Sequence, residues 1–515
     1  MTETPPLTRL PAEESPPEAP VAPRPGGSLM IARALARQAE RAMVRASDSV
    51  LVRGNSARLL VDGPVAFEAW LAAIASAEQW IHLENYIIRD DATGRRFRDA
   101  LVARAEQGIR VRVLYDAVGC WATPKRFWKP FADAGADARP FAPRSLRDPL
   151  NILRRDHRKV VAVDGGYASV AGMCIGDEWA GDPAAGIPAW RDTGVEIRGP
   201  VAAVIDRAFA RSWAEAGDRL PQEEIPDPET VARAGDVSVR VVEGEPGRSR
   251  IYRLSQFIAV GVERRLWVTD PYFVTPPAMT EAFAAAARDG VDVRIIVPAY
   301  NNWPIVGGFS RAGYRPLLEA GVRLFEWEGP MIHAKTAVAD GVWSRVGSSN
   351  LNLASLLGNW ELDVAILDRE VAAEMEDLFL RDMQSSVELR LRAPSANLGK
   401  RSVHREPVLE QAMAPNAREV AAARSARQRA PRGRPIGRLV GRVARASSVL
   451  GRALFGQRLV GREDRGWILI IALGLLGLAT LGLFAPRFLA WPLSFILFWL
   501  GIASVFRAWS GGNPD

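Results

Sequence analysis

Two histidine–lysine motifs of the same pattern stand far apart in this chain of 515 residues. Residues 157–164 read HRKVVAVD and residues 333–340 read HAKTAVAD, so both fit His-x-Lys-x-x-x-x-Asp. Lysine is rare here, and it follows a given histidine at this spacing by chance about five times in 515, so two such pairs have odds near one in ten thousand. The repeat therefore indicates chemistry rather than two ordinary core histidines.

The spacing within each motif predicts where its members lie. The candidate catalytic residues are His157, Lys159, Asp164, His333, Lys335 and Asp340. Side chains two residues apart on a strand point to one face, so the histidine and lysine of each motif are expected to face a common site. Each aspartate has the opposite parity and is followed by glycine, which favours a supporting role where the strand turns.

Two imidazoles and two ammonium groups around one site suit phosphoryl transfer. The lysines would stabilise charge on the non-bridging phosphate oxygens. One histidine can attack phosphorus while the other protonates the leaving alkoxide, and an ordinary imidazole pKa permits both roles. Their order is left open. No cluster of acids and histidines suggests a metal, and no cofactor is expected.

A second segment follows the second motif closely. Residues 347–350 read GSSN and residues 359–361 read NWE. Ser348 and Asn350 could donate hydrogen bonds to phosphate oxygens, and Glu361 could hold His333 through its second ring nitrogen. An ordinary turn is the alternative, but the position ten residues after the motif favours the functional interpretation.

The elements that carry the motifs also repeat. Strand-like and helix-like segments alternate in the order 80–88, 95–107 and 109–115, and again in the order 266–273, 280–289 and 291–297. This alternation predicts an α/β fold made of two similar domains, residues 29–220 and 237–395, joined by an acidic linker. A site shared at the pseudo-twofold interface of the two domains follows as a hypothesis.

These motifs resemble the phospholipase D superfamily, and most closely its bacterial cardiolipin synthase branch, over about residues 55–390. Further matching segments are Glu84-Asn85-Tyr86, Gly176-Asp177-Glu178-Trp179, Trp190-Arg191-Asp192-Thr193 and Asp270-Pro271-Tyr272-Phe273. The resemblance implies two α/β/α sandwich domains with one active site between them. It also implies a covalent phosphatidyl-histidine intermediate formed without metal, and it places the histidine-orienting acids at Asp192 and Glu361.

The sequence departs from the family's pattern at a few positions. Residues 171–174 read AGMC, so Gly172 keeps a glycine of the family's segment while Cys174 stands where the family has asparagine. Gly194 replaces a histidine frequent in the branch, and the arginine often found before Glu361 is absent, with Ala354-Ser355 in that stretch. These departures leave the core chemistry complete and the substrate pair open.

The ends of the chain have a different composition. Residues 1–28 hold eight prolines and predict a disordered tail without a signal peptide. Residues 396–465 predict a basic linker with an amphipathic helix, and within them residues 424–465 carry twelve arginines against two acids. Residues 467–507 are two apolar runs around an Ala-Pro-Arg turn, which predicts a transmembrane helical hairpin; a buried hairpin of a soluble domain is the alternative.

Charge and anchor together predict the setting of the protein. The net charge is +7, but the arginine stripe alone is +10, so the rest of the chain is nearly neutral. By the positive-inside rule the catalytic body faces the cytoplasm of a bacterial inner membrane, although Arg487 in the turn opposes this. The expected partners are the membrane and an anionic phospholipid such as phosphatidylglycerol, with no nucleic acid and no obligate protein partner.

Four functions compete at this stage. The leading one is a membrane-bound phosphatidyltransferase that passes a phosphatidyl group to an alcohol, such as a second phosphatidylglycerol, and so makes cardiolipin. A phospholipase D that uses water and releases phosphatidic acid is the main alternative. A nuclease of the same fold is disfavoured by the nearly neutral body, and a non-enzymatic scaffold is disfavoured by two complete motifs.

Overall fold

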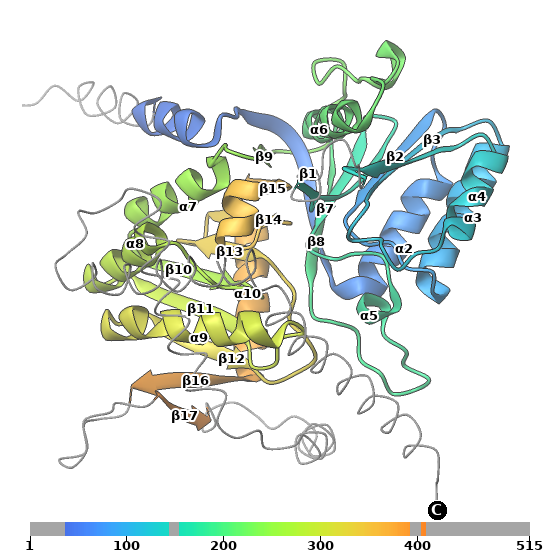
Figure 1. Cartoon of the computed structure of the whole chain (residues 1–515). Helices are drawn as coiled ribbons and strands as arrows, with labels where there is room; N and C mark the ends of the chain where they lie inside the picture. The colour runs from blue at the N-terminus through green and yellow to red at the C-terminus, as the bar shows by residue number, and fades with distance from the viewer. Residues whose placement is uncertain (1–36, 144–153, 392–402, 408–515) are drawn as a thin grey trace, which may run out of the picture.

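The computed structural model describes residues 37–143, 154–391 and 403–407 (Figure 1). The first half contains, in chain order, β1 (Leu51–Val61), α2 (Asp62–Ala75), β2 (Trp80–Asn85), α3 (Ala92–Glu106), β3 (Arg110–Asp116), α4 (Lys125–Asp133), β4 (Asp137–Phe141), β5 (Arg155–Asp156), β6 (Lys159–Val163), β7 (Tyr167–Ala171), α5 (Asp177–Ala180), β8 (Thr193–Arg198) and α6 (Pro200–Ala216). A short 3₁₀ helix, η2 (Gln222–Glu224), lies in the connection to the second half.

The second half repeats this succession. It contains β9 (Val237–Gly244), α7 (Arg250–Gly261), β10 (Arg265–Thr269), α8 (Pro277–Arg288), β11 (Asp292–Pro298), α9 (Pro304–Glu319), β12 (Arg323–Trp327), β13 (Thr336–Ala339), β14 (Trp343–Gly347), η3 (Ala354–Gly358), β15 (Asn359–Leu367), α10 (Arg369–Gln384), β16 (Ser386–Leu391) and β17 (Val403–Pro407). The predicted mixed α/β fold is therefore confirmed.

The two halves build sheets with the same strand order. The first sheet runs β4-β3-β2-β6-β7-β8-β1, and the second runs β12-β11-β10-β13-β14-β15-β9. In both, the first three strands are parallel and the next strands are antiparallel. Strand β1 also pairs with β9 through Leu51 and Val52, so the halves share backbone hydrogen bonds.

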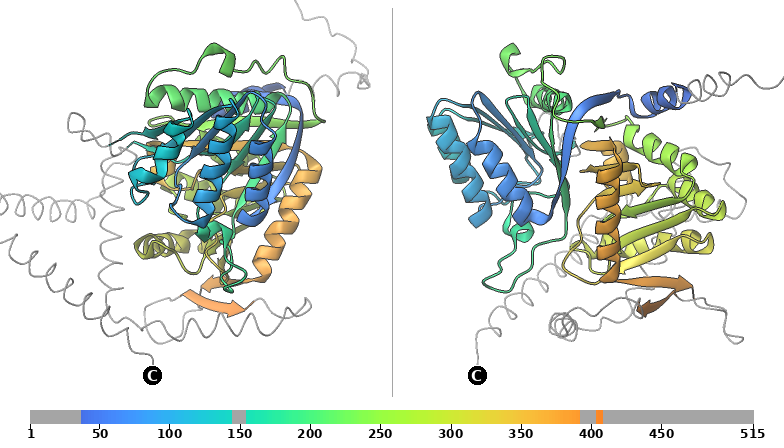
Figure 2. Two further views of the ribbon diagram at one scale, coloured as in Figure 1. Left: turned by 90° about the vertical axis from the view of Figure 1, so that its right-hand side faces the viewer. Right: turned by 180° about the vertical axis from the view of Figure 1, so that it is seen from behind.

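The layers follow from which faces of the sheets are apolar. Helices α2, α3 and α4 cover the outer face of the first sheet, and α7, α8 and α9 cover the outer face of the second (Figure 2). Between the sheets, buried side chains of both halves form one core, for example Val170 and Ile197 with Val346 and Val364. Central strands such as β6 and β7 are buried on both faces, which explains why their sequences are continuous apolar runs.

Some predicted segments lie outside the described residues. These are the tail 1–28, most of the basic region 396–465 and the hairpin 467–507. Within the basic region the structure differs from the prediction at one place, because residues 403–407 form β17 and pair with β16. In the part of the chain that the structure describes, no helix is both long and apolar enough to cross a bilayer.

Candidate active site

Each motif histidine is fixed by the backbone of the opposite half. The His157 N–H donates to the Trp360 carbonyl at 2.8 Å, and the His333 N–H donates to the Arg191 carbonyl at 2.7 Å. Strand β5, directly before His157, pairs in parallel with the start of β15. These bonds bring segments that are more than 140 residues apart to one place, where the two sheets meet.

The histidine side chains form the same crossed arrangement. Nδ1 of His157 lies 3.0 Å from Oε2 of Glu361, and Nδ1 of His333 lies 2.7 Å from Oδ2 of Asp192. The expectation that Glu361 holds His333 is therefore wrong: the parallel pairing of β5 with β15 delivers Glu361 to His157. A carboxylate that accepts from Nδ1–H leaves Nε2 of the ring for chemistry.

Each acid is itself held in place. The Ser348 hydroxyl donates to Glu361 Oε2 at 2.5 Å, so this serine, expected to reach phosphate, contacts the acid instead. Asp192 accepts from the backbone N–H of Thr193 at 2.8 Å. A Cβ at Gly172 would lie only 2.3 Å from Asp192 Oδ1, so this position requires glycine for the close approach.

The lysines are fully buried beside the histidines. Lys159 donates to the His157 carbonyl, and Lys335 donates to the His333 carbonyl at 2.5 Å. Nζ of Lys335 also lies 2.9 Å from Nε2 of His333. Strands begin only at Lys159 and after Lys335, so the histidines precede the strands. The histidines are therefore not on the strands as expected, although each lysine does contact its histidine.

The charges of the site shift several pKa values. Burial lowers the pKa of His333, and Lys335 lowers it further, to about 3. Burial also lowers the pKa of His157. Burial alone would raise the pKa of Asp192 and of Glu361, but the partner histidine, the neighbouring motif lysine and the hydrogen bonds to each acid together outweigh it and lower both. Each histidine is therefore a neutral base at pH 7, facing an ionised carboxylate.

Burial lowers the pKa of Lys335 as well, to about 8, although Asp192 opposes this. The positive charge of Lys159 also lowers the pKa of Lys335. In the same way, the positive charge of Lys335 lowers the pKa of His157. The two motifs are thus within electrostatic reach of each other. In the part of the chain that the structure describes, no carboxylate is hydrogen-bonded to either ammonium group, so both can contact a phosphate anion.

Two tyrosines complete the site, and the sequence assigned no role to them. The ring of Tyr86 lies 4.8 Å from that of His157, and Nζ of Lys159 lies 5.1 Å above it. Tyr272 takes the equivalent position, 5.8 Å from the His333 ring. The signal that could have found them is their shared place, just beyond the ends of β2 and β10.

Two tryptophans enclose His333 on the first-half side. The rings of Trp179 and Trp190 lie 5.6 Å and 5.7 Å from that of His333. The Trp179 Nε1–H also donates to Asp192 at 3.2 Å. Both lie in segments that matched the family pattern, but spacing alone did not show that they reach a histidine of the other half.

The motif aspartates lie at the far ends of the motif strands, as predicted. Asp164 has φ 50° and Asp340 has φ 51°, in the turns that leave β6 and β13. The carboxylate of Asp340 accepts three backbone N–H groups, those of residues 263, 264 and 265. Asp164 does the same for residues 78, 79 and 80, so both aspartates pin a turn to the start of a neighbouring strand.

The residues that follow the two motif hairpins differ between the halves. Asn350 is buried, and its amide donates to the Ser355 hydroxyl at 3.4 Å. Cys174 is buried too, and burial raises the pKa of its thiol while both motif lysines lower it. Cys174 is therefore within electrostatic reach of the two ammonium groups. No group of three or more potential metal ligands was found among the residues that the structure describes.

Comparison with known proteins places the chain among cardiolipin synthases. A family model described as "Cardiolipin synthase, PLD-like domain" matches residues 261–383. A cardiolipin synthase of Geobacillus kaustophilus is 33% identical over 330 residues, which are 63% of this chain and 66% of that protein. Cardiolipin synthase A of Pseudomonas putida is 33% identical over 351 residues, 68% of this chain and 73% of that protein.

A solved structure shares the fold. The phosphatidylserine synthase of Haemophilus influenzae superposes with a TM-score of 0.54 and 14% identity, over 68% of this chain and 92% of that one. Two like-ordered sheets with crossed histidine–acid pairs define a phospholipase D-like protein. Within that class, the sequence relatives show that the chain belongs to the cardiolipin synthase family. The matched region covers just under two thirds of the Geobacillus relative.

Proposed function

We propose that the protein is a phosphatidyltransferase that joins a phosphatidyl group to an alcohol and makes cardiolipin from anionic phospholipid. The observation that carries this proposal is the crossed arrangement, in which Nδ1–H of each motif histidine donates to a carboxylate of the opposite half. Such a pair provides two oriented imidazoles in one site, one for attack and one for proton transfer. The cardiolipin synthase relatives support the choice of substrate class.

In the first step, Nε2 of one histidine attacks the phosphorus of phosphatidylglycerol, and the bond from phosphorus to the glycerol oxygen breaks. The other histidine gives its proton to the departing alkoxide. Lys159 and Lys335 stabilise the charge that develops on the non-bridging oxygens. The bound phosphodiester is itself an anion, so it raises the pKa of both histidines and allows one of them to carry this proton.

In the second step, an alcohol replaces glycerol. The now neutral second histidine removes the proton of the alcohol, the oxygen attacks phosphorus, and the phosphorus–nitrogen bond breaks. With a second phosphatidylglycerol the product is cardiolipin, and with water it is phosphatidic acid. The rings of Tyr86 and Tyr272 pack against the two histidines and reduce the access of water to them, which favours transfer over hydrolysis.

The same proposal includes the setting of the enzyme. Residues 29–220 and 237–395 are the two catalytic domains, related by a pseudo-twofold axis at the shared site. The hairpin 467–507 anchors them to the bacterial inner membrane with the body on the cytoplasmic side. The basic region 424–465 lies on anionic lipid, where each arginine near the surface contributes about 1 kcal/mol.

Incubation of the purified protein with labelled phosphatidylglycerol tests the proposal. Cardiolipin and glycerol are the expected products, and His157→Ala and His333→Ala are each expected to abolish their formation. His404→Ala is the control, since this histidine lies in β17 outside both motifs. Phosphatidic acid as the sole product would favour a phospholipase D, cleaved DNA without lipid product a nuclease, and substantial activity of either motif variant would contradict a shared site.

A further inference from the structure

In the described residues, the exposed aromatic side chains lie on two equivalent loops. Among the large apolar residues that are exposed in the described part of the chain, the aromatic ones are Trp121, Tyr300 and Trp303, with 74%, 69% and 64% of their surface accessible. Trp121 lies between β3 and α4, and the other two lie between β11 and α9. Because β3 and β11 hold the same place in their sheets, these are corresponding loops.

Both loops lie at the edge of the sheets where the active site is. Strands β2 and β3 are parallel, as are β10 and β11, so the loops after β3 and β11 stand beside the segments that carry Tyr86 and Tyr272. This carboxyl edge of parallel strands is where α/β proteins bind their ligands. The exposed aromatic side chains therefore lie at the same edge of the sheets as the histidine pair, and they are absent from the opposite edge in the described residues.

The first loop is tied to the active-site segment. A Cβ at Gly119 would lie 1.9 Å from the Tyr86 carbonyl oxygen, so the loop backbone packs directly on this tyrosine. The Ile88 N–H donates to the sulfur of Cys120 at 3.2 Å, and the Thr123 hydroxyl donates to the Ile88 carbonyl at 2.5 Å. Trp121 is thus held on a rigid support at a set distance from the reacting groups.

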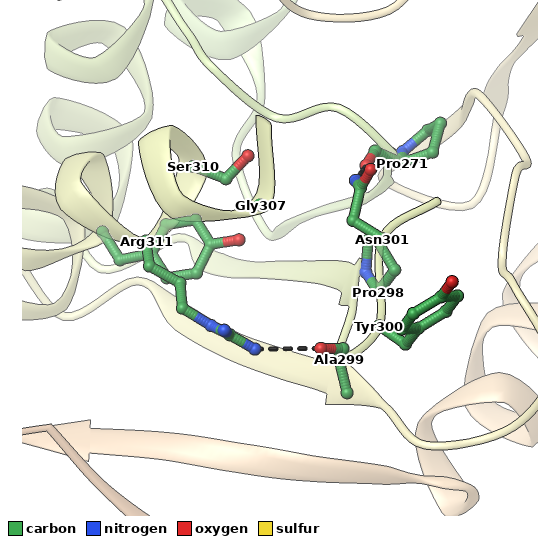
Figure 3. Close-up of a pocket in the computed structure, with 9 residues that line it drawn as sticks. Pro271, Pro298, Ala299, Tyr300, Asn301, Gly307, Ser310 and Arg311 are labelled. Atoms are coloured by element: carbon green, nitrogen blue, oxygen red, sulfur yellow. Dashed lines mark hydrogen bonds between the residues drawn. The ribbon is translucent and has the colours of Figure 1, made fainter. Parts of the chain in front are cut away.

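The second loop has equivalent ties. The Asn301 amide donates to the Pro271 carbonyl at 2.8 Å, and the Tyr272 hydroxyl donates to Asn302 at 2.8 Å. Figure 3 shows Asn301 pointing to Pro271 and Arg311 reaching the Ala299 carbonyl, across a cavity of about 170 Å³. The ring of Tyr300 points away from Arg311 in this view. Both loops therefore present aromatic rings outward from fixed backbones.

The two loop segments carry basic residues and no acid of their own. Residues 117–132 contain three basic residues and no acid, and residues 299–318 contain two arginines and no acid. Arg126 and Lys129, on the helix after the first loop, are 81% and 72% exposed, and each also lies beside an acid, Asp90 at 3.6 Å and Asp133 at 2.6 Å. Tryptophan and tyrosine prefer the boundary between lipid headgroups and acyl chains, and basic residues beside them attract anionic headgroups.

We propose that these two loops dock the catalytic body onto the surface of an anionic bilayer, with Trp121, Tyr300 and Trp303 inserted between the headgroups. The inference rests on the proposed function only in taking the reactant from a membrane. Docking at two corresponding loops on either side of the site presents the histidine pair to the plane of the phosphodiesters. It is separate from the predicted hairpin anchor, which holds the chain at the membrane but does not orient the body.

The test uses the full chain reconstituted in vesicles of phosphatidylglycerol and phosphatidylcholine. Trp121→Cys and Trp303→Cys are each labelled with an environment-sensitive fluorophore; the native cysteines are buried and react slowly. Lipids brominated near the headgroup are expected to quench both labels. The control is Val260→Cys, since Val260 is 80% exposed and lies near the end of α7, which precedes the opposite end of β10. Equal quenching at all three positions, or none, would overturn the proposal.

Two further outcomes identify other occupants of the surface. A spectral shift that needs no lipid and grows with protein concentration would show a second copy on the loops. A spectral shift that needs no lipid and does not depend on protein concentration would show that another segment of this chain covers the two loops. Either result would overturn the docking of lipid.

A second measurement uses catalysis. The double variant Trp121→Ser/Trp303→Ser is expected to lose about tenfold or more of its turnover on vesicles while it keeps turnover of monomeric short-chain phosphatidylglycerol within about twofold. Val260→Ser is expected to change neither. Equal loss on both substrates would contradict docking. Quenching without turnover of any lipid would instead refute the proposed transferase and leave the docking surface standing.

Discussion

The pairing of each histidine with an acid of the other half is the central fact at the scale of residues. It makes the site depend on both halves at once, because each motif histidine has its carboxylate partner in the opposite half. The two pairs also differ. Glu361 is supported by the Ser348 hydroxyl, whereas Asp192 is supported by the indole of Trp179. The halves are therefore similar in plan but chemically unequal at the reacting groups.

The crossed pairing predicts which histidine responds to which acid. Glu361 raises the pKa of His157 against burial, so Glu361→Gln is expected to lower the pKa of His157 further and leave that of His333 unchanged. Asp192→Asn is expected to do the reverse. The chain has only four histidines, so selective labelling and NMR titration can follow each ring. His82, bound to Asp206, is the internal control, and movement of the uncrossed histidine would contradict the pairing.

The lysines predict a limit on activity at alkaline pH. The pKa of Lys335 is lowered to about 8, chiefly by burial, so the free enzyme loses a positive charge as pH rises through this value. We expect kcat/KM for a monomeric substrate to fall above about pH 8, because neutral Lys335 no longer stabilises the phosphate anion. A profile of kcat/KM against pH measures this. Lys129→Ala, at an exposed lysine, should leave the profile unchanged, and constant kcat/KM to pH 10 would contradict the assignment.

At the scale of elements, the motif aspartates join strands rather than act on substrate. Asp340 accepts three N–H groups at the start of β10, at the end of β13 remote from Lys335. Its positive φ is one that asparagine tolerates. The motif thus combines a catalytic end and a structural end on one short strand. This explains why the aspartate follows the histidine at the same spacing in both motifs.

Because Asp340 holds a turn rather than substrate, Asp340→Asn is expected to lose stability but keep activity. The variant removes an ionised acceptor and is expected to lower the free energy of unfolding by about 1–3 kcal/mol, with kcat within about twofold at low temperature. The pKa of Asp340 is lowered because its hydrogen bonds outweigh burial. Its contribution is therefore present above the ordinary carboxyl pKa and lost as pH falls through the lower folded value. Thermal unfolding at pH 7 and pH 3 measures this, and a hundredfold loss of kcat would indicate a catalytic role.

Much of this could be predicted from the sequence, for definable reasons. The motif residues and the repeated α/β order follow from the spacing of residues along the chain, which can be read from the sequence. The partner of Glu361 does not, because spacing along one half carries no information about which histidine of the other half it meets. Spacing along the first half likewise does not show that Trp179 and Trp190 lie beside His333 of the second half. The start of β6 after His157 was missed because the pairing of β5 with β15 diverts the backbone just before the strand.

At the scale of the whole molecule, buried ion pairs, strand pairing and a shared apolar core join the two halves. Arg191 of the first half makes a buried, two-pronged ion pair with Asp382 of α10, with both distances 2.8 Å. Arg240 of the second half reaches back to Glu40 at 2.8 Å. Together with the β1–β9 pairing and the apolar core between the sheets, these bonds hold the crossed histidines independently of the connecting chain.

The connection between the halves is therefore expected to be dispensable once the protein has folded. A protease site placed at the exposed residues Glu229 and Thr230 allows the folded chain to be cut. The cut protein should elute at the size of the intact protein and keep its kcat, because an interface with a continuous apolar core holds its parts without a covalent link. The uncut variant is the control. Separation of the fragments with loss of activity would show that the linker, rather than the core and the crossed pairs, keeps each histidine beside its acid.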